Sequence, residues 1–149
     1  MADAPVPIDA VAPRLAEPAA LRGVRILVVE DDEDSRGVIA LLLEGSGAVV
    51  TASASVADAL DALHAHRFDI VVSDIEMPGE DGYALVGAIR RTPELSALPV
   101  IALTAHAGES ERHRALDSGF AAHVAKPVGE GQLPAIVARV LRANRISAS

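Results

Sequence analysis

Five short apolar runs recur along this 149-residue chain, and a stretch with helical spacing follows each of them. Such near-continuous runs of Val, Ile and Leu are typical of strands that are buried on both faces of a sheet. Parallel strands need helical crossovers, so the alternation predicts an α/β fold with a doubly wound (βα)5 parallel sheet of five strands. The runs lie at residues 25–29, 48–52, 69–74, 98–104 and 121–125.

The order of the strands follows from their connections. Crossovers between parallel strands are right-handed, and a chain of this size with five units favours the flavodoxin-like strand order 2-1-3-4-5. In that order the first and third strands are neighbours. Ligands of open α/β sheets bind beyond the carboxyl ends of the strands at this switch point. We therefore expect functional residues directly after the first strand and its neighbours.

The helical stretches carry recognisable starts and stops. Asp32 or Asp34 is expected to cap the first helix, and Ser55 to cap the second. Gly45-Ser46-Gly47 is expected to be a turn rather than a nucleotide-binding loop, because it follows a helix and not a strand. Pro93 should end the third helix. We expect a polar helix over residues 108–118 and an amphipathic last helix with apolar positions from Leu133 to Leu141.

Length and composition limit the domain organisation. The chain has the size of one domain, and we expect one folded unit over residues 23–145. Residues 1–22 hold four of the nine prolines and are expected to form a flexible tail. Residues 146–149 are expected to fray. The core must consist of aliphatic residues, because only three residues are aromatic.

Charge and composition also exclude several classes of function. A formal net charge of −8 argues against a nucleic-acid partner, since such surfaces need clustered Lys and Arg. The chain has no cysteine, which excludes disulfides and thiolate metal sites. No apolar run approaches the roughly 20 residues that span a bilayer, and no secretory signal precedes the first strand. We therefore expect a cytoplasmic protein with no membrane partner.

Polar side chains stand at the ends of four of the predicted strands. The first strand is followed by Glu30 and Asp31, the third ends in Asp74, the fourth in Thr104, and the fifth is followed by Lys126. Carboxylates that lie close together repel one another and need a compensating cation. With oxygen ligands and no cysteine, Mg²⁺ is the expected metal, and Mn²⁺ is expected to substitute for it.

A metal, an ammonium group and a hydroxyl around a carboxylate form a site for phosphoryl transfer. Asp74 would attack phosphorus as the nucleophile and form an acyl phosphate. Mg²⁺ and Lys126 would neutralise the equatorial oxygens, while Thr104 would donate a hydrogen bond to one of them.

The chain from about Val24 to Leu141 resembles the receiver domain of two-component response regulators. The resemblance rests on ILVVEDD at the first strand, SDIEMPGEDG at the third, LTA at the fourth and AKP at the fifth. It implies that Glu30 and Asp31 are the metal-binding acidic pair and that Asp74 is the phosphoacceptor. Thr104 would be the switch hydroxyl, and Lys126 would be the phosphate-binding lysine.

The resemblance implies three further features. The backbone carbonyl of Glu76 would complete the metal site, and the peptide between Lys126 and Pro127 would be cis. Glu76 and His106 would flank the phosphoryl group and tune its lifetime. One position departs from the family: His123 stands where the fifth strand usually carries the Tyr or Phe of the switch, and an imidazole is smaller and titrates near neutral pH.

The resemblance also implies a signalling protein and not a metabolic enzyme. The phosphoryl donor would be a sensor histidine kinase or a phosphotransfer protein, and phosphorylation would switch a surface for a downstream protein. The chain could equally be one receiver module of a larger hybrid kinase. Two other functions remain open: an aspartyl-phosphate hydrolase of the haloacid dehalogenase type, which requires an Asp where Glu76 stands, and an interaction module that works without phosphorylation. His64, His66 and His113 are expected to be solvated helix residues.

Overall fold

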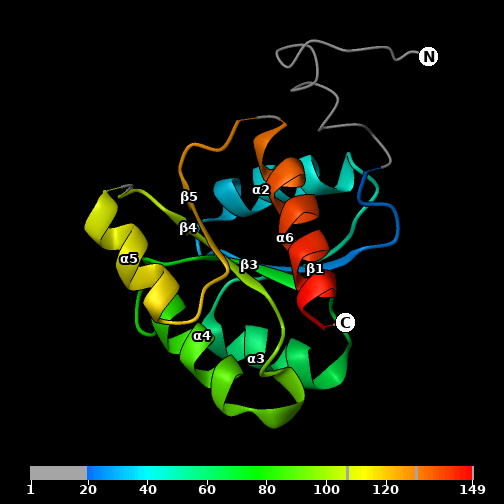
Figure 1. The fold of residues 1–149 in the computed structure, drawn as a ribbon. Helices are drawn as coiled ribbons and strands as arrows, with labels where there is room; N and C mark the ends of the chain where they lie inside the picture. The colour runs from blue at the N-terminus through cyan, green and yellow to red at the C-terminus, as the bar shows by residue number, and fades with distance from the viewer. Residues whose placement is uncertain (1–19, 107, 130, 149) are drawn as a thin grey trace, which may run out of the picture.

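The centre of the molecule is a parallel sheet of five strands (Figure 1). The computed structural model describes residues 20–106, 108–129 and 131–148. The strand order is β2-β1-β3-β4-β5, as the sequence predicts. Each strand lies within two residues of its expected range; the largest difference is at β4, which begins after Pro99 because proline has no N–H to donate to a neighbouring strand. The strands are β1 (Arg25–Val29), β2 (Val49–Ser53), β3 (Ile70–Asp74), β4 (Val100–Thr104) and β5 (Ala122–Ala125).

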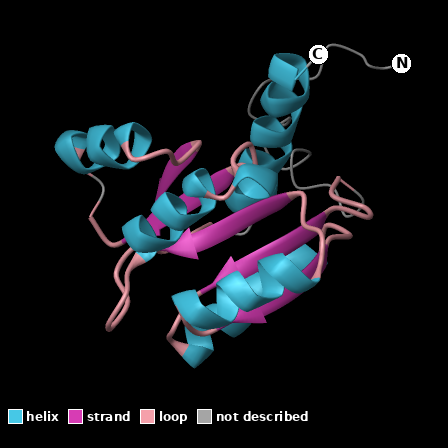
Figure 2. Cartoon of the chain, turned by 90° about the horizontal axis from the view of Figure 1, so that it is seen from below, coloured by secondary structure: helices cyan, strands magenta, loops and turns pink. Residues whose placement is uncertain are grey.

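Helices cover both faces of the sheet, which gives three layers (Figure 2). One face packs against α2 (Glu33–Glu44) and α6 (Gln132–Ala148), through a core that includes Ile26, Val28, Leu43 and Val137. The other face packs against α3, α4 and α5, through a core that includes Leu27, Val71, Leu63 and Leu85. Because neighbouring residues of a strand point to opposite faces, every apolar position of β1 and β3 is buried. The three helices of the second face are α3 (Val56–Ala65), α4 (Gly82–Arg91) and α5 (Glu109–Asp117).

Local signals set the ends of the helices. Asp32 and Ser55 cap α2 and α3, as predicted, and their side chains accept hydrogen bonds from the N–H groups of Ser35 and Asp58. The helix α4 ends at Arg91, and a short 3₁₀ turn (Pro93–Leu95, η1) follows it. Residues 45–47 form the expected turn. The peptide between Lys126 and Pro127 is cis, as the resemblance implied.

The folded unit begins earlier than the sequence suggested. Leu21, which we expected in the tail, is 1% exposed and belongs to the core beneath α2 and α6. Its N–H donates to the carbonyl of Ser46 at 2.7 Å, which ties the chain to the turn after α2. Residues 1–19 of the expected tail lie outside the described residues. At the other end, α6 runs to Ala148, well past the apolar pattern that ends at Leu141.

The helix α5 is the most polar of the helices. Ala115 is its one buried residue, in agreement with its weak sequence pattern. Arg90 of α4 holds the loop that follows α5, because its guanidinium donates to the carbonyls of Gly119, Ser96 and Leu98. None of the helices in the described part of the chain is both long enough and apolar enough to cross a membrane.

Candidate phosphorylation site

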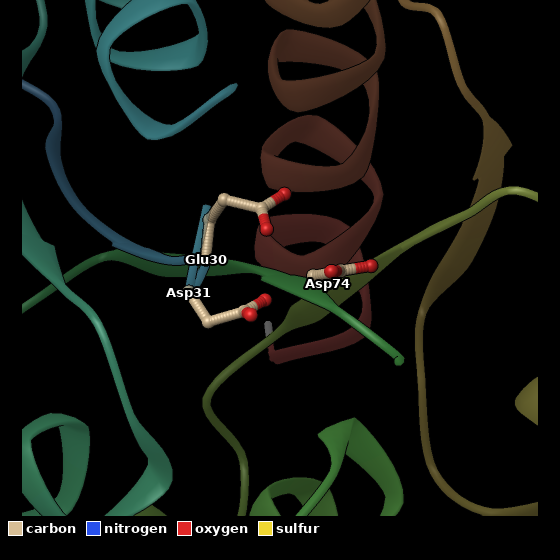
Figure 3. Close-up of side chains that lie close together, drawn as sticks. All are labelled: Glu30, Asp31 and Asp74. Carbon is tan, nitrogen blue, oxygen red and sulfur yellow. The ribbon is translucent and has the colours of Figure 1, made fainter. Parts of the chain in front are cut away.

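Three carboxylates meet at the carboxyl edge of the sheet. Glu30 and Asp31 follow β1, and Asp74 ends the neighbouring strand β3. One oxygen of each side chain lies within 4.8 Å of the others, and the three carboxylates are directed at the same space (Figure 3). Glu30 and Asp74 are buried, whereas Asp31 is exposed. The sequence prediction that these residues come together is therefore correct.

Lys126 provides the cation beside these carboxylates. Its Nζ lies 2.7 Å from Oε1 of Glu30 and 3.4 Å from Oδ1 of Asp74. Burial by itself would lower the pKa of Lys126, but the hydrogen bond to Glu30 and the charges of Asp74 and Glu30 outweigh it. The pKa of Lys126 is therefore raised above its usual value of 10.5.

The carboxylate of Glu30 is held at both oxygens. While Oε1 accepts from Lys126, Oε2 accepts from the N–H of Asp32 at 3.2 Å. Asp32 is engaged in turn as the cap of α2, and the hydrogen bond from Ser35 lowers the pKa of its carboxyl. Asp74 is engaged as well, because its Oδ1 accepts from the N–H of Glu76 at 3.4 Å and lies 3.4 Å from Lys126 Nζ, whereas Asp31 is the exposed member of the cluster. An all-oxygen set of this kind fits Mg²⁺.

Two residues that the sequence analysis did not single out support the cluster. Arg36 of α2 donates through one guanidinium nitrogen to the carbonyls of Glu30 and Asp31, at 3.0 and 3.3 Å. Gly82 starts α4 directly against Asp74, because a Cβ at this position would lie 2.6 Å from the carbonyl oxygen of Asp74. Arg36 comes two residues after the acidic run from Glu30 to Asp34, and this proximity was the available signal for the first of them.

Thr104 lies at the end of β4, on the strand next to Asp74. Its side chain is buried, and its hydroxyl accepts from the N–H of His106 at 2.9 Å and lies 3.2 Å from the carbonyl of the same residue. In this structure the hydroxyl is therefore hydrogen-bonded to the backbone of the loop after β4. The loop also carries the side chain of His106 to Glu76, with 2.8 Å between Nε2 and Oε2. This pair joins the loops after β3 and β4 on the two sides of the site.

His123 lies on β5, in register with Ala102 of β4. The residue is partly buried, and its Nε2 is the buried side-chain polar atom without a hydrogen-bond partner among the described residues. A buried polar atom without a partner is costly, so this imidazole differs from His64, His66 and His113, which are exposed as expected.

A groove of about 480 Å³ adjoins the site on the side of α2. Lys126 is one of the residues that line it, and its walls are mainly apolar. Along α2, Val38 and Leu41 are 56% and 69% exposed, which is unusual for large apolar side chains on a helix that also packs on the sheet. The groove is lined by Asp34, Ser35, Val38, Ile39, Leu42, Lys126, Pro127 and Val128.

The sequence profile of the response regulator receiver domain matches residues 26–138, which is most of the chain and includes every residue of the acidic cluster. The chain belongs to this family. Receiver domains are signalling domains, and they occur both in response regulators and in sensor kinases. This family assignment agrees with the fold and with the resemblance in the sequence.

Relatives of the receiver domain differ widely in total length. The chain is 43% identical over 112 residues to an uncharacterised 14.6 kDa protein of Leptolyngbya boryana and covers 86% of it. It is 36% identical over 137 residues to the sensor protein GacS of Pseudomonas syringae, using 87% of this chain but only 15% of that protein. The response regulator Rre1 of Synechocystis is 33% identical, and the chain covers 56% of it.

Solved receiver domains share the fold over nearly their whole length. A putative response regulator of Chloroflexus aurantiacus has a TM-score of 0.77 at 30% identity, over 81% of this chain and 99% of that one. The receiver domain of the sensor histidine kinase PA1611 of Pseudomonas aeruginosa has a TM-score of 0.74 at 32% identity, over 80% and 98%. That structure carries a magnesium ion coordinated in its active-site cleft.

Proposed function

We propose that this receiver domain accepts a phosphoryl group on Asp74 from a phosphohistidine protein, in the presence of Mg²⁺. The observation that carries the proposal is the meeting of Glu30, Asp31 and Asp74 within 4.8 Å, with the Lys126 ammonium against two of them. Asp74 is the one of the three that ends a central strand, so its carboxylate has a fixed direction of attack.

The chemistry assigns one role to each residue. An oxygen of Asp74 forms a bond to phosphorus while the bond from phosphorus to the imidazole nitrogen breaks, and the imidazole leaves with that electron pair. Glu30, Asp31, Asp74 and the carbonyl of Glu76 would hold Mg²⁺, or Mn²⁺ in its place. When bound, the metal neutralises charge on the phosphoryl oxygens. Lys126 binds one of these oxygens, and Thr104 turns its hydroxyl from His106 to another.

The donor, in our proposal, docks on the apolar groove beside α2. A phosphohistidine must reach Asp74, and Lys126, whose ammonium lies 3.4 Å from Oδ1 of Asp74, also lines this groove. The exposed Val38 and Leu41 suit the apolar face of a helix, because helix-in-groove contacts depend on such anchors. A helix of a sensor histidine kinase or phosphotransfer protein is therefore the occupant that we propose for this groove.

The output of the domain is a protein-binding surface rather than turnover of a metabolite. Phosphorylation would draw Thr104 toward the phosphate and change the surroundings of His123 on the neighbouring strand. Because the Nε2 atom of His123 lacks a partner in this structure, a rearrangement that supplied one would be favourable. Thr104 and His123 are the pair that we propose as the switch.

The test is incubation with a small-molecule phosphodonor such as acetyl phosphate, followed by measurement of the intact mass. Our proposal predicts one phosphoryl group per chain with Mg²⁺, none with a chelator, and none in Asp74→Asn. Rapid, repeated hydrolysis of a phosphate ester would favour the haloacid dehalogenase type of enzyme. No adduct in the wild-type protein under any condition would favour an interaction module that works without phosphorylation.

A further inference from the structure

We infer that Arg36 is a positioning residue for the metal site, because it fixes the backbone that presents Glu30 and Asp31 to Asp74. The inference rests on the proposed function for the identity of the metal ligands. Among the described residues, the guanidinium of Arg36 donates hydrogen bonds to main-chain carbonyls and to no carboxylate oxygen.

The contact geometry shows what Arg36 restrains. One guanidinium nitrogen, Nη1, reaches the carbonyl of Glu30 at 3.0 Å and that of Asp31 at 3.3 Å. Two consecutive carbonyls are thus held by a single charged donor. Charge-assisted hydrogen bonds of this kind are stronger than neutral ones. The peptide between Glu30 and Asp31 therefore has little freedom to rotate.

The position of this peptide decides where the carboxylates lie. Glu30 and Asp31 come after the last residue of β1, so they lie beyond the residues that pair in the ladder of that strand. The N–H of Glu30 still donates to the carbonyl of Ser53, and the helix begins only at Glu33. Between these points the carbonyls depend on Arg36. A rotated peptide would move Asp31, which is the exposed member of the cluster, away from Asp74.

Arg36 also offsets negative charge of the carboxylate cluster without occupying an oxygen that the metal would bind. Lys126 contacts the carboxylate oxygen Oε1 of Glu30 directly, so it occupies a possible ligand atom. Arg36 instead binds the carbonyls of Glu30 and Asp31, so it occupies no side-chain oxygen of Glu30, Asp31 or Asp74. A cation in this position reduces repulsion among the carboxylates in the metal-free protein and still keeps the space between them open.

Metal binding tests this role without any phosphoryl transfer. Free Mn²⁺ is measured by electron paramagnetic resonance as it is titrated into the wild-type protein, Arg36→Met and Arg36→Lys. Loss of partners that orient metal ligands typically costs between 10-fold and 100-fold in affinity. We expect Arg36→Met to bind Mn²⁺ at least about 10-fold more weakly than the wild type, and Arg36→Lys to fall between them, because lysine keeps the charge but not the guanidinium geometry.

Two controls separate positioning from general damage. Arg91→Met removes the same charge from an exposed site in the last turn of α4 and should bind Mn²⁺ as the wild type does. Amide hydrogen exchange of the metal-free protein should increase at residues 31–33 in Arg36→Met and stay unchanged in the strands. Exchange that increases throughout the sheet would show a loss of fold instead. In that case the Mn²⁺ affinity of Arg36→Lys, compared with that of the wild type, becomes the test of the inference.

The inference is overturned if Arg36→Met folds and binds Mn²⁺ within twofold of the wild type, or if Arg36→Lys binds it as tightly as the wild type. A failure of this inference and a failure of the proposed function give different results. Suppose that Arg36→Met weakens Mn²⁺ binding but the wild-type protein takes no phosphoryl group. This result would refute the proposed function and leave the positioning role intact.

Discussion

The ammonium of Lys126 lies closer to Glu30 than to Asp74, with 2.7 Å to Oε1 of Glu30 and 3.4 Å to Oδ1 of Asp74. The lysine therefore offsets the negative charge of Glu30 and Asp74 in the absence of a phosphoryl group. Because Lys126 is partly exposed and Glu30 is almost fully buried, the lysine is free to move toward a phosphate while Glu30 stays in place. Binding of Mg²⁺ would release Lys126 from Glu30 for that purpose.

The titration of Lys126 follows from this arrangement. Lys126 is the single lysine of the chain, so selective ¹³Cε labelling of lysine gives one side-chain signal in NMR. We predict a pKa above 10.5 in the folded protein, and a lower pKa in Asp74→Asn, because Asp74 is one of the charges that raise it. A pKa at or below 10.5 in the wild type would contradict the arrangement.

The same shift predicts how stability depends on pH. Lys126 binds its proton more tightly in the folded than in the unfolded chain, so its contribution is fully present below about pH 10.5. It is lost as the pH rises through the higher pKa of the folded state. Urea unfolding of the wild type and of Lys126→Met should therefore converge above pH 10.5. Parallel curves across this range would argue against the ion pair.

Removal of the lysine should destabilise the metal-free protein. Lys126→Met leaves the Glu30 carboxylate, which is 1% exposed, without its cation, and we expect a loss of about 2 kcal/mol in the free energy of unfolding. The double variant Lys126→Met with Glu30→Gln should recover part of this loss, since no charge is then left unpaired. Equal stability of the two variants would contradict the pairing. Urea denaturation at neutral pH is the measurement.

The contact between Glu76 and His106 should slow the loss of the phosphoryl group. It joins the loops after β3 and β4 with 2.8 Å between Oε2 and Nε2, so its removal would admit water to Asp74. An exposed pair contributes up to about 1 kcal/mol, so we expect His106→Ala to hydrolyse its acyl phosphate roughly twofold to fivefold faster.

The matched control for His106 is His113→Ala, since both histidines are 66% exposed and lie next to a glutamate. His113 pairs with Glu109 within α5 and not across the site. Its substitution should leave the hydrolysis rate unchanged when the adduct is followed by intact mass. A change of the same size in both variants would assign the effect to helix α5 or to charge alone.

The proposed docking groove predicts a difference between protein and small-molecule donors. Val38→Asp places a charge at the groove, so transfer from the phosphohistidine domain of a sensor kinase that phosphorylates the wild type should fall about tenfold or more. Phosphorylation by acetyl phosphate should not change, because this donor needs no docking surface.

The control for Val38 is Val49→Asp, since both valines are 56% exposed and Val49 lies on β2 at the edge of the sheet. Its transfer rate should match that of the wild type with either donor. Equal loss in both variants, or a loss with acetyl phosphate as well, would reject the groove as the docking surface.

Much of this architecture could be read from the sequence because it depends on local patterns. Apolar runs marked the strands, and the residues that follow them identified the carboxylates, the threonine and the lysine that meet at one edge. Other features depend on contacts between distant segments. Leu21 carries no strand or helix signal, and its burial follows from packing under α2 and α6. The sequence analysis did not single out Arg36, because its contact with the carbonyl of Glu30 depends on how α2 lies against the end of β1.

The sequence predicted which residues come together at the site, but not which of them contact one another. Charge balance indicated that a cation must join the carboxylates, for which the sequence analysis expected Mg²⁺, and the Lys126 ammonium lies against two of them. Which carboxylate it prefers depends on side-chain geometry at the ends of β3 and β5, which no sequence pattern encodes. The same holds for Thr104, whose hydroxyl bonds to the backbone of His106 rather than pointing free into the site.

The most direct test of the central claim is to locate the phosphoryl group. After phosphorylation with acetyl phosphate and Mg²⁺, reduction with borohydride converts an aspartyl phosphate to homoserine, and peptide mass spectrometry then finds the converted residue. Our account predicts conversion at Asp74, and at no other aspartate or glutamate. Conversion at Asp31 or another carboxylate, or phosphate retained on a histidine, would contradict it.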